Sequence, residues 1–501
     1  MAIFVVTGVT TWALIATNSP STADEARISS VRINAIRTGL SVGVGAGGVI
    51  ALGLATRKQW LGERSQAHQE EVAMSTIMDA TERRITDLYG KAVDQLGSEK
   101  PAVRIGGILA LERLAQANEG HRQTVADVLC AYLRMPLAIP EHVDFRTANP
   151  FALQSAIVDE SIKQEVQVRI TAQSILKKHL YRDAKKADDF WRGIKVDLTG
   201  ATLITLDFSE CELGGLRCAN ARFLGTTRLA GCSFDETSNF RNATFCGHVD
   251  LDRAVFKSGA RFINAEFQAT ASFLQAIFTC GIRCDEAKFG KEVHFRGAEF
   301  GKIAAFDRAV FAEGAVFSEC EFYENGQFTG AEFYQRAMFR RALFHGPAVF
   351  SAATFLRAVQ FGDSLFEGRV RFHGTSFHGP IGFVRARFNR ELSFREIAFD
   401  SHVKFGDAHL GYGAHFRKVK FKEGVTFDGN RNSGESVFFS CAFEGPTRFC
   451  NSKRRGVRFI ESYVESERNL VVHPVGWLVS PVPTRQGKFE IIRWRPPLAL
   501  P

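Results

Sequence analysis

Phenylalanine recurs in this chain at alternating intervals of six and five residues, a rhythm that few folds can accommodate. The stretch AVFAEGAVFSECEFYENGQFTGAEF, residues 309–333, illustrates it. Two interleaved series, each with a step of eleven, define 39 positions from Phe240 to Phe449, and 35 of them are Phe. The chain has 45 Phe against 7 Tyr and 5 Trp. Such uniform rings indicate a repeat with an apolar interior.

A small or branched apolar residue stands two positions before most rings, as at Ala243, Ala254 and Val359. Residues i−2 and i share one face of an extended segment, so each unit is expected to be one short strand with two inward side chains. An eleven-residue period also occurs in right-handed helical supercoils. That alternative does not fit, because apolar offsets of about 0, 4, 6 and 9 spread around a helix.

This arrangement resembles the pentapeptide-repeat family, in which the central residue is Leu or Phe and the i−2 residue is commonly Ala. The tripeptides ATL, ARF, AEF, AKF and AVF carry the resemblance between about Val196 and Phe459. It implies a mainly β fold, a right-handed quadrilateral parallel β-helix. The six-residue steps depart from a strict five and predict that alternate corners are one residue larger. Left-handed β-helices of acyltransferases keep a strict six-residue step and do not fit.

Four sides of alternating length make a coil of 22 residues, so residues 196–460 predict about 12 coils and a rod of about 57 Å. Asn432 interrupts the series and predicts an outward loop. Rings on one side should stack about 4.8 Å apart and supply most of the stability. The predicted core ladder consists of Phe245, Phe256, Phe267, Phe278, Phe289, Phe300, Phe311, Phe322, Phe333, Phe344, Phe262, Phe273, Phe295, Phe306, Phe317 and Phe328.

Two uncharged runs open the chain and predict a transmembrane hairpin over residues 1–58, with spans at about 2–18 and 38–56. A signal peptide is the alternative for the first run, which lacks a positively charged start. The segment GVGAGG also matches a dinucleotide-binding fingerprint, but no strand precedes it. We expect instead that glycines every fourth residue let two helices approach closely in lipid. These glycines are Gly39, Gly43 and Gly47.

Residues 59–190 predict a small α-helical domain, because apolar side chains recur there with helical spacing, as at Val125, Val128 and Leu129. With the hairpin before it, this segment resembles the front end of membrane-anchored pentapeptide-repeat proteins of bacteria. Residues 461–501 are rich in Pro, break the phenylalanine rhythm and predict a C-terminal cap or tail.

The ten cysteines form no CxxC pair and indicate free thiols in a reducing compartment. We therefore expect a bacterial inner-membrane protein whose β-helix faces the cytoplasm. Six of the cysteines occupy positions predicted to point inward: Cys211, Cys218, Cys232, Cys284, Cys320 and Cys441.

Chemistry-bearing residues give no sign of catalysis. His373 and His378 each follow a ring and should point outward on successive sides, without a third metal ligand. A core packed with rings offers no substrate pocket. We expect no enzymatic activity, no cofactor and no metal.

Charge is distributed unevenly along the repeat. Residues 197–335 hold 13 Lys/Arg and 19 Asp/Glu, whereas residues 336–460 hold 21 and 10. Some pentapeptide-repeat proteins are acidic rods that imitate DNA and bind topoisomerases. The basic half of this repeat argues against such mimicry along the whole rod. The basic half could instead contact anionic lipid headgroups or nucleic acid. The alternative is that it is a solvated face without a dedicated partner. The predicted basic surface comprises Arg417, Lys418, Lys420, Lys422, Lys453, Arg454 and Arg455.

The preferred functional hypothesis is a non-enzymatic scaffold, tethered to the bilayer, that presents the rigid β-helix to a protein partner. The alternative is a nucleic-acid or topoisomerase-directed binding protein that uses the charged faces of the β-helix.

Overall fold

The computed structural model describes residues 2–17, 25–137, 159–182, 189–429, 431–449, 456–466, 469–472, 477–480, 484 and 486–493. The chain divides into two compact units, Met1–Leu88 and Tyr89–Pro501. The first is helical, and the second contains a helical domain followed by a β-solenoid.

The first unit consists of α1 (Ala2–Thr17) and most of α2 (Glu25–Leu96). No helix within the described residues combines the length and apolar character needed to cross a bilayer. The 16 residues of α1 rise only about 24 Å, against a hydrocarbon core of about 30 Å. Six of the 19 residues in 38–56 are Gly and add little apolar surface. The predicted transmembrane hairpin is therefore not supported.

α2 is one continuous helix of 72 residues. It runs through residues 58 and 59, where the sequence predicted a domain boundary, so that boundary is wrong. The glycines predicted to pack helices in a membrane are Gly39, Gly43 and Gly47, and all three fall within α2. The packing around them lies outside what the structure describes, so that prediction stays a prediction.

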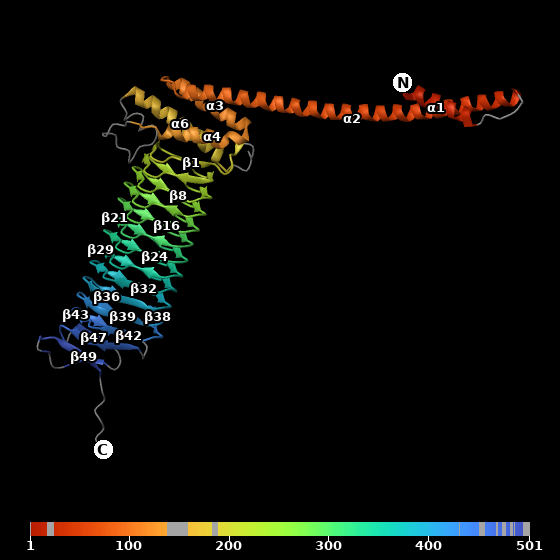
Figure 1. Cartoon of the computed structure of the whole chain (residues 1–501). Helices are drawn as coiled ribbons and strands as arrows, with labels where there is room; N and C mark the ends of the chain where they lie inside the picture. The colour runs from red at the N-terminus through yellow and green to blue at the C-terminus, as the bar shows by residue number, and fades with distance from the viewer. Residues whose placement is uncertain are drawn as a thin grey trace, which may run out of the picture. The chain divides into compact units, whose positions relative to one another are not determined.

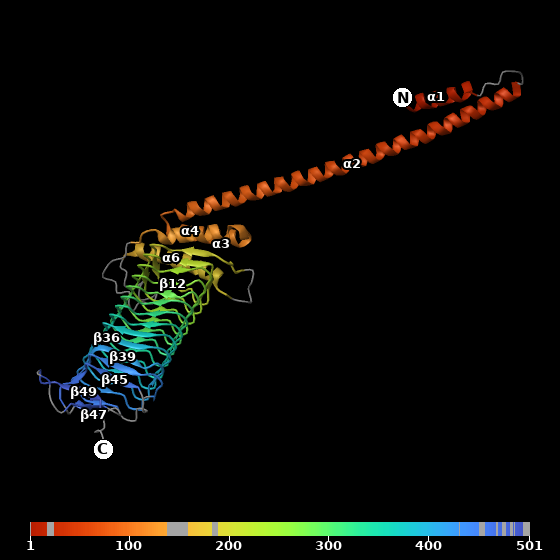
Figure 2. The same ribbon diagram turned by 60° about the horizontal axis from the view of Figure 1, so that its bottom comes forward.

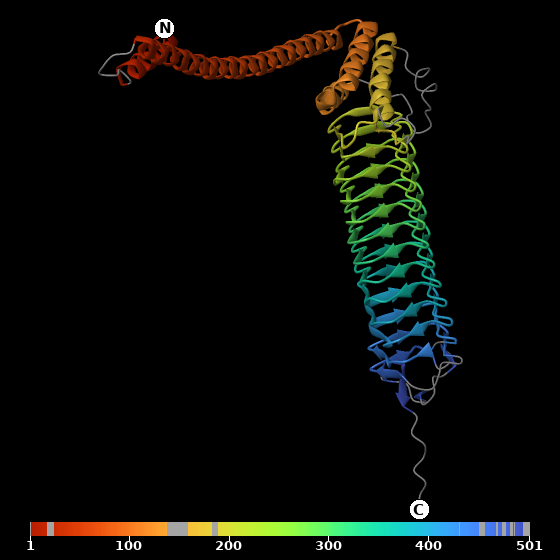
Figure 3. The same cartoon turned by 90° about the vertical axis from the view of Figure 1, so that its right-hand side faces the viewer.

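From Lys195 onward the second unit is a β-solenoid built from very short parallel strands (Figure 1). One coil contains β12 (Ala260–Arg261), β13 (Glu266–Phe267), β14 (Ala271–Ser272) and β15 (Ile277–Phe278). The next strand, β16 (Ile282–Arg283), stacks on β12 with Ala260 opposite Ile282, 22 residues later. The four resulting columns of strands are named here the β12, β13, β14 and β15 faces. Figure 3 shows the coils stacked in register, and the predicted parallel β-solenoid is confirmed.

Columns of stacked rings fill the solenoid. On the β13 face Phe245, Phe267 and Phe289 stack with centroid separations of 4.8 Å. Rings of different columns meet edge-on, as Phe262 and Phe273 do at 89°. Both geometries suit the aromatic quadrupole. Every ring of the predicted ladder is at most 1 % exposed: Phe245, Phe256, Phe262, Phe267, Phe273, Phe278, Phe289, Phe295, Phe300, Phe306, Phe311, Phe317, Phe322, Phe328, Phe333 and Phe344.

The two step lengths make two kinds of corner. In the five-residue step after Phe262, Asn264 adopts a left-handed backbone with φ 55°. The N–H of Ala265 then donates to the carbonyl of Phe262 at 3.0 Å, which closes a tight turn. Asn tolerates this conformation better than most residues. The six-residue step from Phe267 to Phe273 has one residue more and no left-handed residue, so its corner is larger.

The C-terminal end departs from the sequence-based prediction at one point. Asn432 belongs to β41 (Arg431–Asn432), which pairs in parallel with β38 (His409–Leu410). The predicted outward loop there is wrong, because the backbone continues the β15 face. After the last coil, β49 (Phe489–Arg493) pairs antiparallel with β46 (Tyr463–Val464). This reversal of strand direction ends the parallel stack.

Three helices cover the N-terminal end of the solenoid: α3 (Pro101–Ala117), α4 (Arg122–Arg134) and α6 (Glu160–Leu180) (Figure 2). Two glutamines join them to the first coil. Gln123 of α4 pairs with the backbone of Lys195, accepting from its N–H at 3.0 Å and donating to its carbonyl at 2.9 Å. Gln173 of α6 makes the equivalent pair with Ile204. These helices satisfy backbone groups that an open first coil would expose.

Candidate binding surface

Among the described residues, no group of three or more His, Cys, Asp or Glu is placed to hold a metal ion. His373 lies on the β12 face, with its Nε2 3.2 Å from Ser393 Oγ. His378 lies on the β13 face, with its Nδ1 2.6 Å from Asp400 Oδ2. The two imidazoles thus occupy successive faces and do not converge.

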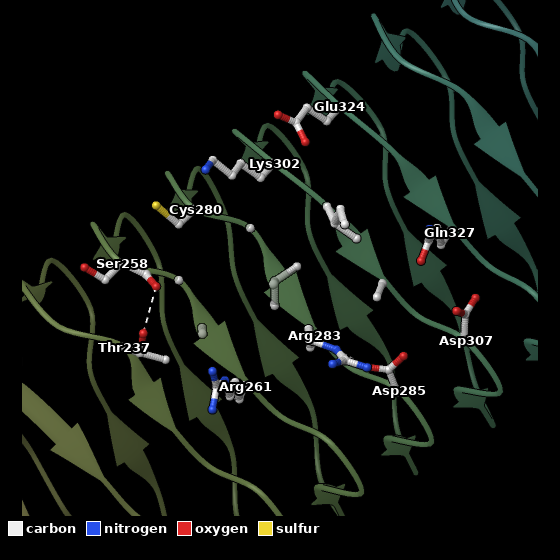
Figure 4. A pocket seen from close by; sticks show the side chains of 16 residues that line it. Thr237, Ser258, Arg261, Cys280, Arg283, Asp285, Lys302, Asp307, Glu324 and Gln327 are labelled. Carbon is white, nitrogen blue, oxygen red and sulfur yellow. Dashed lines mark hydrogen bonds and ion pairs between the residues drawn. The ribbon is translucent and has the colours of Figure 1, made fainter.

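A shallow hollow of about 430 Å³ lies on the β12 face near the first coils. Figure 4 shows Ser258, Cys280, Lys302 and Glu324 following one another along its edge. Arg283 also lines it, and its Nε donates to Asp285 at 2.8 Å. Because both charge signs line the hollow, and Arg283 and Asp285 neutralise each other, it favours no ligand of one charge.

The described members of the predicted basic surface do not share one face of the solenoid. Arg417 lies on the β12 face and Lys418 at the corner, with a left-handed φ of 56°. Lys420 lies on the β13 face, and Lys422 is paired there with Asp400 at 2.7 Å. The prediction is wrong because a run of consecutive residues turns a corner of the solenoid. The remaining members lie outside the described residues: Lys453, Arg454 and Arg455.

The structure instead brings together side chains from three successive coils. They come from β32 (Val370–His373), β36 (Leu392–Phe399) and β39 (Ala414–Phe421). These strands pair in parallel and in register, so that six outward side chains form two rows of three. They are named here the arginine–histidine patch. One row is Arg371, Ser393 and His415; the other is His373, Arg395 and Arg417.

The strands of the patch are longer than most strands of the solenoid. Most strands of the solenoid have two residues, whereas β36 and β39 have eight each and continue from the β12 face onto the β13 face. Within them burial alternates, with Phe394 and Phe416 buried and Arg395 and Arg417 exposed. The stacked rings beneath therefore hold the outward side chains of adjacent strands about 4.8 Å apart.

Positive charge dominates the patch. Burial lowers the pKa of His373, and the guanidinium groups of Arg371 and Arg395 lower it further, because they disfavour a third positive charge. Arg417 lies over the ring of Phe439, 5.5 Å from its centroid, a cation–π contact that orients the guanidinium.

Carboxylates stand only at the rim of the patch. Glu396 is 3.4 Å from Arg395 Nε, and Glu391 is 4.0 Å from Arg369. Among the described residues no carboxylate forms an ion pair with Arg371 or Arg417. The patch therefore holds cationic and polar donors that face solvent, an arrangement that attracts anions.

Sequence reasoning missed this patch although its signal was present. Its members recur at intervals of 22, the length of one coil, as RFH at 371–373, SFR at 393–395 and HFR at 415–417. Arranging the sequence in lines of 22 would have aligned them. The predicted basic surface was instead chosen from neighbours along the chain.

Comparison with known proteins bears on the repeat alone. A family model described as pentapeptide repeats (9 copies) matches residues 219–264, 295–343 and 328–376. Comparison with curated proteins and with solved structures produced no match. The matched ranges lie within the solenoid, and strands β36 and β39 of the patch lie beyond them.

Proposed function

The solenoid of this chain belongs to the pentapeptide-repeat family, and from this premise we propose that the protein is a non-enzymatic scaffold. Its flat outer faces bind another protein, and its function is to hold that partner in a fixed position.

The proposal rests on one observation: phenylalanine rings fill the interior of the solenoid, and its outer side chains are aligned from coil to coil. Rings such as Phe295 and Phe317, buried and stacked 4.9 Å apart, occupy the space where a catalytic cleft would otherwise form. Outside, each face repeats its side chains at the spacing of the coils. A rigid surface of this kind loses little conformational freedom on binding, which favours association.

The proposed location is the bacterial inner membrane, with the solenoid in the cytoplasm. Large apolar side chains exposed on the N-terminal helices support it, among them Phe4, Trp12, Val44 and Leu52, each at least 70 % exposed. Extensive apolar surface of this kind is a liability in water. The described cysteines are free thiols, as a reducing compartment requires.

Fractionation tests the location. The intact protein should sediment with membranes, and a variant lacking residues 1–58 should remain in the supernatant. Recovery of the intact protein in the soluble fraction without detergent would contradict the location and leave the scaffold proposal standing.

Direct binding tests the scaffold itself. The intact protein, purified in detergent, serves as bait for a membrane extract, and each captured protein is then purified and titrated against it. We expect saturable binding at a fixed stoichiometry. If no captured protein binds directly, or if the protein turns over a small molecule, the scaffold proposal fails.

The second candidate function is binding of nucleic acid or anionic lipid by the basic half, residues 336–460. Arg371 and Arg417 of the arginine–histidine patch, which form no ion pair with a carboxylate of the described residues, favour it. Binding of duplex DNA or of vesicles containing anionic phospholipid should then weaken steeply as salt rises, and absence of both at low salt excludes it.

A further inference from the structure

The arginine–histidine patch surrounds a hydroxyl group. Ser393, its shortest side chain, lies between Arg371 and His415 on the adjacent strands and two residues from Arg395 on its own strand. The Nε2 of His373 is 3.2 Å from the Ser393 hydroxyl. Longer arginine and histidine side chains therefore enclose a small central residue, and their donors can reach a group placed above it.

The patch is bounded on both sides. Toward the N-terminus the coil above Arg371 presents Val349. Toward the C-terminus the coil below His415 and Arg417 presents Val437 and Phe439. Three strands and two positions on each strand give a site of about 10 by 7 Å. Duplex nucleic acid engages cations along a longer track, whereas this site suits one compact anion.

The donors match the chemistry of a phosphate monoester. Such a group carries a charge of about −1.5 to −2 at neutral pH and three acceptor oxygens. Guanidinium groups bind it through paired, charge-assisted hydrogen bonds. Arg371, Arg395 and Arg417 supply three guanidinium groups. Arg395 also pairs with Glu396 at the rim, at 3.4 Å, and the exposed Glu396 side chain can give way to a phosphate. A peptide carboxylate would use fewer of these donors.

Resting on the proposed scaffold function, we propose that the arginine–histidine patch binds a phosphorylated side chain of the partner protein. The phosphate lies above Ser393, and the three arginines contact its oxygens. Binding of the partner is thereby made dependent on its phosphorylation.

The test uses the full-length protein in detergent and three variants of equal length. The patch variant carries Arg371→Gln, Arg395→Gln and Arg417→Gln. The control variant carries Arg336→Gln, Arg357→Gln and Arg387→Gln, which remove the same charge from exposed positions elsewhere on the solenoid. A third variant, Ser393→Glu, places a carboxylate at the centre of the patch. Thermal unfolding of each variant verifies its fold.

The probes are inorganic phosphate, a pool of phosphoserine peptides with random flanking residues, and the same pool without phosphate. We expect the phosphorylated pool to bind at least about tenfold more tightly than the unphosphorylated one, in line with charge-assisted hydrogen bonds. The preference should vanish in the patch variant and in Ser393→Glu and persist in the control variant. Inorganic phosphate should compete with the peptides.

The inference is overturned if both peptide pools bind equally, or if the patch and control variants lose peptide binding equally. It is also overturned if no peptide binds but duplex DNA or anionic vesicles bind and the patch variant abolishes that binding. A partner that binds the patch variant as tightly as the original protein also defeats the inference and leaves the scaffold intact. Failure to find any protein partner defeats the scaffold, whereas the peptide measurements are independent of it.

Discussion

The side-chain amide of Gln173 pairs with both backbone groups of Ile204. Its Nε2 donates to the Ile204 carbonyl at 2.7 Å, and its Oε1 accepts from the Ile204 N–H at 3.1 Å. Gln173 is only 5 % exposed and Ile204 is fully buried. In later coils these backbone groups are hydrogen-bonded by the strand of the preceding coil, and in the first coil Gln173 takes the place of that strand. Water cannot make these hydrogen bonds, because the site is buried.

Replacing Gln173 with Leu should destabilise the protein by about 1–3 kcal/mol for each backbone group left unpaired. Gln123→Leu is the matched control, since Gln123 makes the same pair of bonds to the exposed Lys195. Water can replace those bonds, so the control should lose much less. Denaturant titration measures both, and equal losses would contradict this account of the buried pair.

Phe317→Ala should lower the free energy of unfolding by about 3–5 kcal/mol, the range found when a buried aromatic ring is deleted. The Phe317 ring stacks between Phe295 and Phe339 at 4.9 and 5.0 Å and is fully buried. Tyr334→Ala removes an outward ring that is 44 % exposed and should cost under about 1 kcal/mol. Similar costs for both would mean that the ring columns do not carry the stability.

Cys280 should be the first of the nine described cysteines to react with iodoacetamide in the native protein, because it alone is exposed. Burial raises the pKa of Cys130 to about 12 and that of Cys284 well above its usual range, which suppresses the reactive thiolate. Peptide mass spectrometry after brief labelling checks the order. If Cys284 reacts as fast as Cys280, the coil that contains Cys284 opens to solvent and does not bury it as described.

His345 should make the protein more stable at mildly acidic pH. Its Nδ1 lies 2.7 Å from Glu367 and its Nε2 2.8 Å from Glu321, and these hydrogen bonds raise the pKa of His345 in the folded state. The stabilisation is complete below the unfolded-state pKa of about 6.5 and is lost as pH rises through the higher folded-state value.

The expected size of this effect is at most about 1 kcal/mol, because the His345 side chain is one-third exposed. Melting temperatures at about pH 6 and pH 8.5 should differ less in His345→Gln than in the original protein. If the two proteins show the same dependence on pH, the two glutamates do not bind the protonated ring.

The solenoid could be predicted because its rule is local. A ring at i and a small residue at i−2, as in Ala265 and Phe267, are enough to define an inward-facing strand, and the step lengths count the residues in a coil. The difference between corners is also local, since it follows from whether five or six residues separate successive inward rings.

The arginine–histidine patch was not predicted, because its members are neighbours only across coils. Arg395 and Arg417 are 22 residues apart in sequence and opposite each other in the sheet. Adjacent Arg417 and Lys418, in contrast, lie on a face and at a corner. The hydrogen bonds between the Gln173 side chain and the Ile204 backbone have no local signal in the sequence either. They join a helix and a strand that come together only in the folded protein.

The reversed strand at one end of the stack and the glutamine-bearing helices at the other have a consequence for growth. A column of parallel strands is a template on which further copies could polymerise. Here β49 lies antiparallel on β46 at one end, and Gln123 and Gln173 pair with strand backbone at the other, so each end offers a second copy fewer free strand edges than an uncapped stack would.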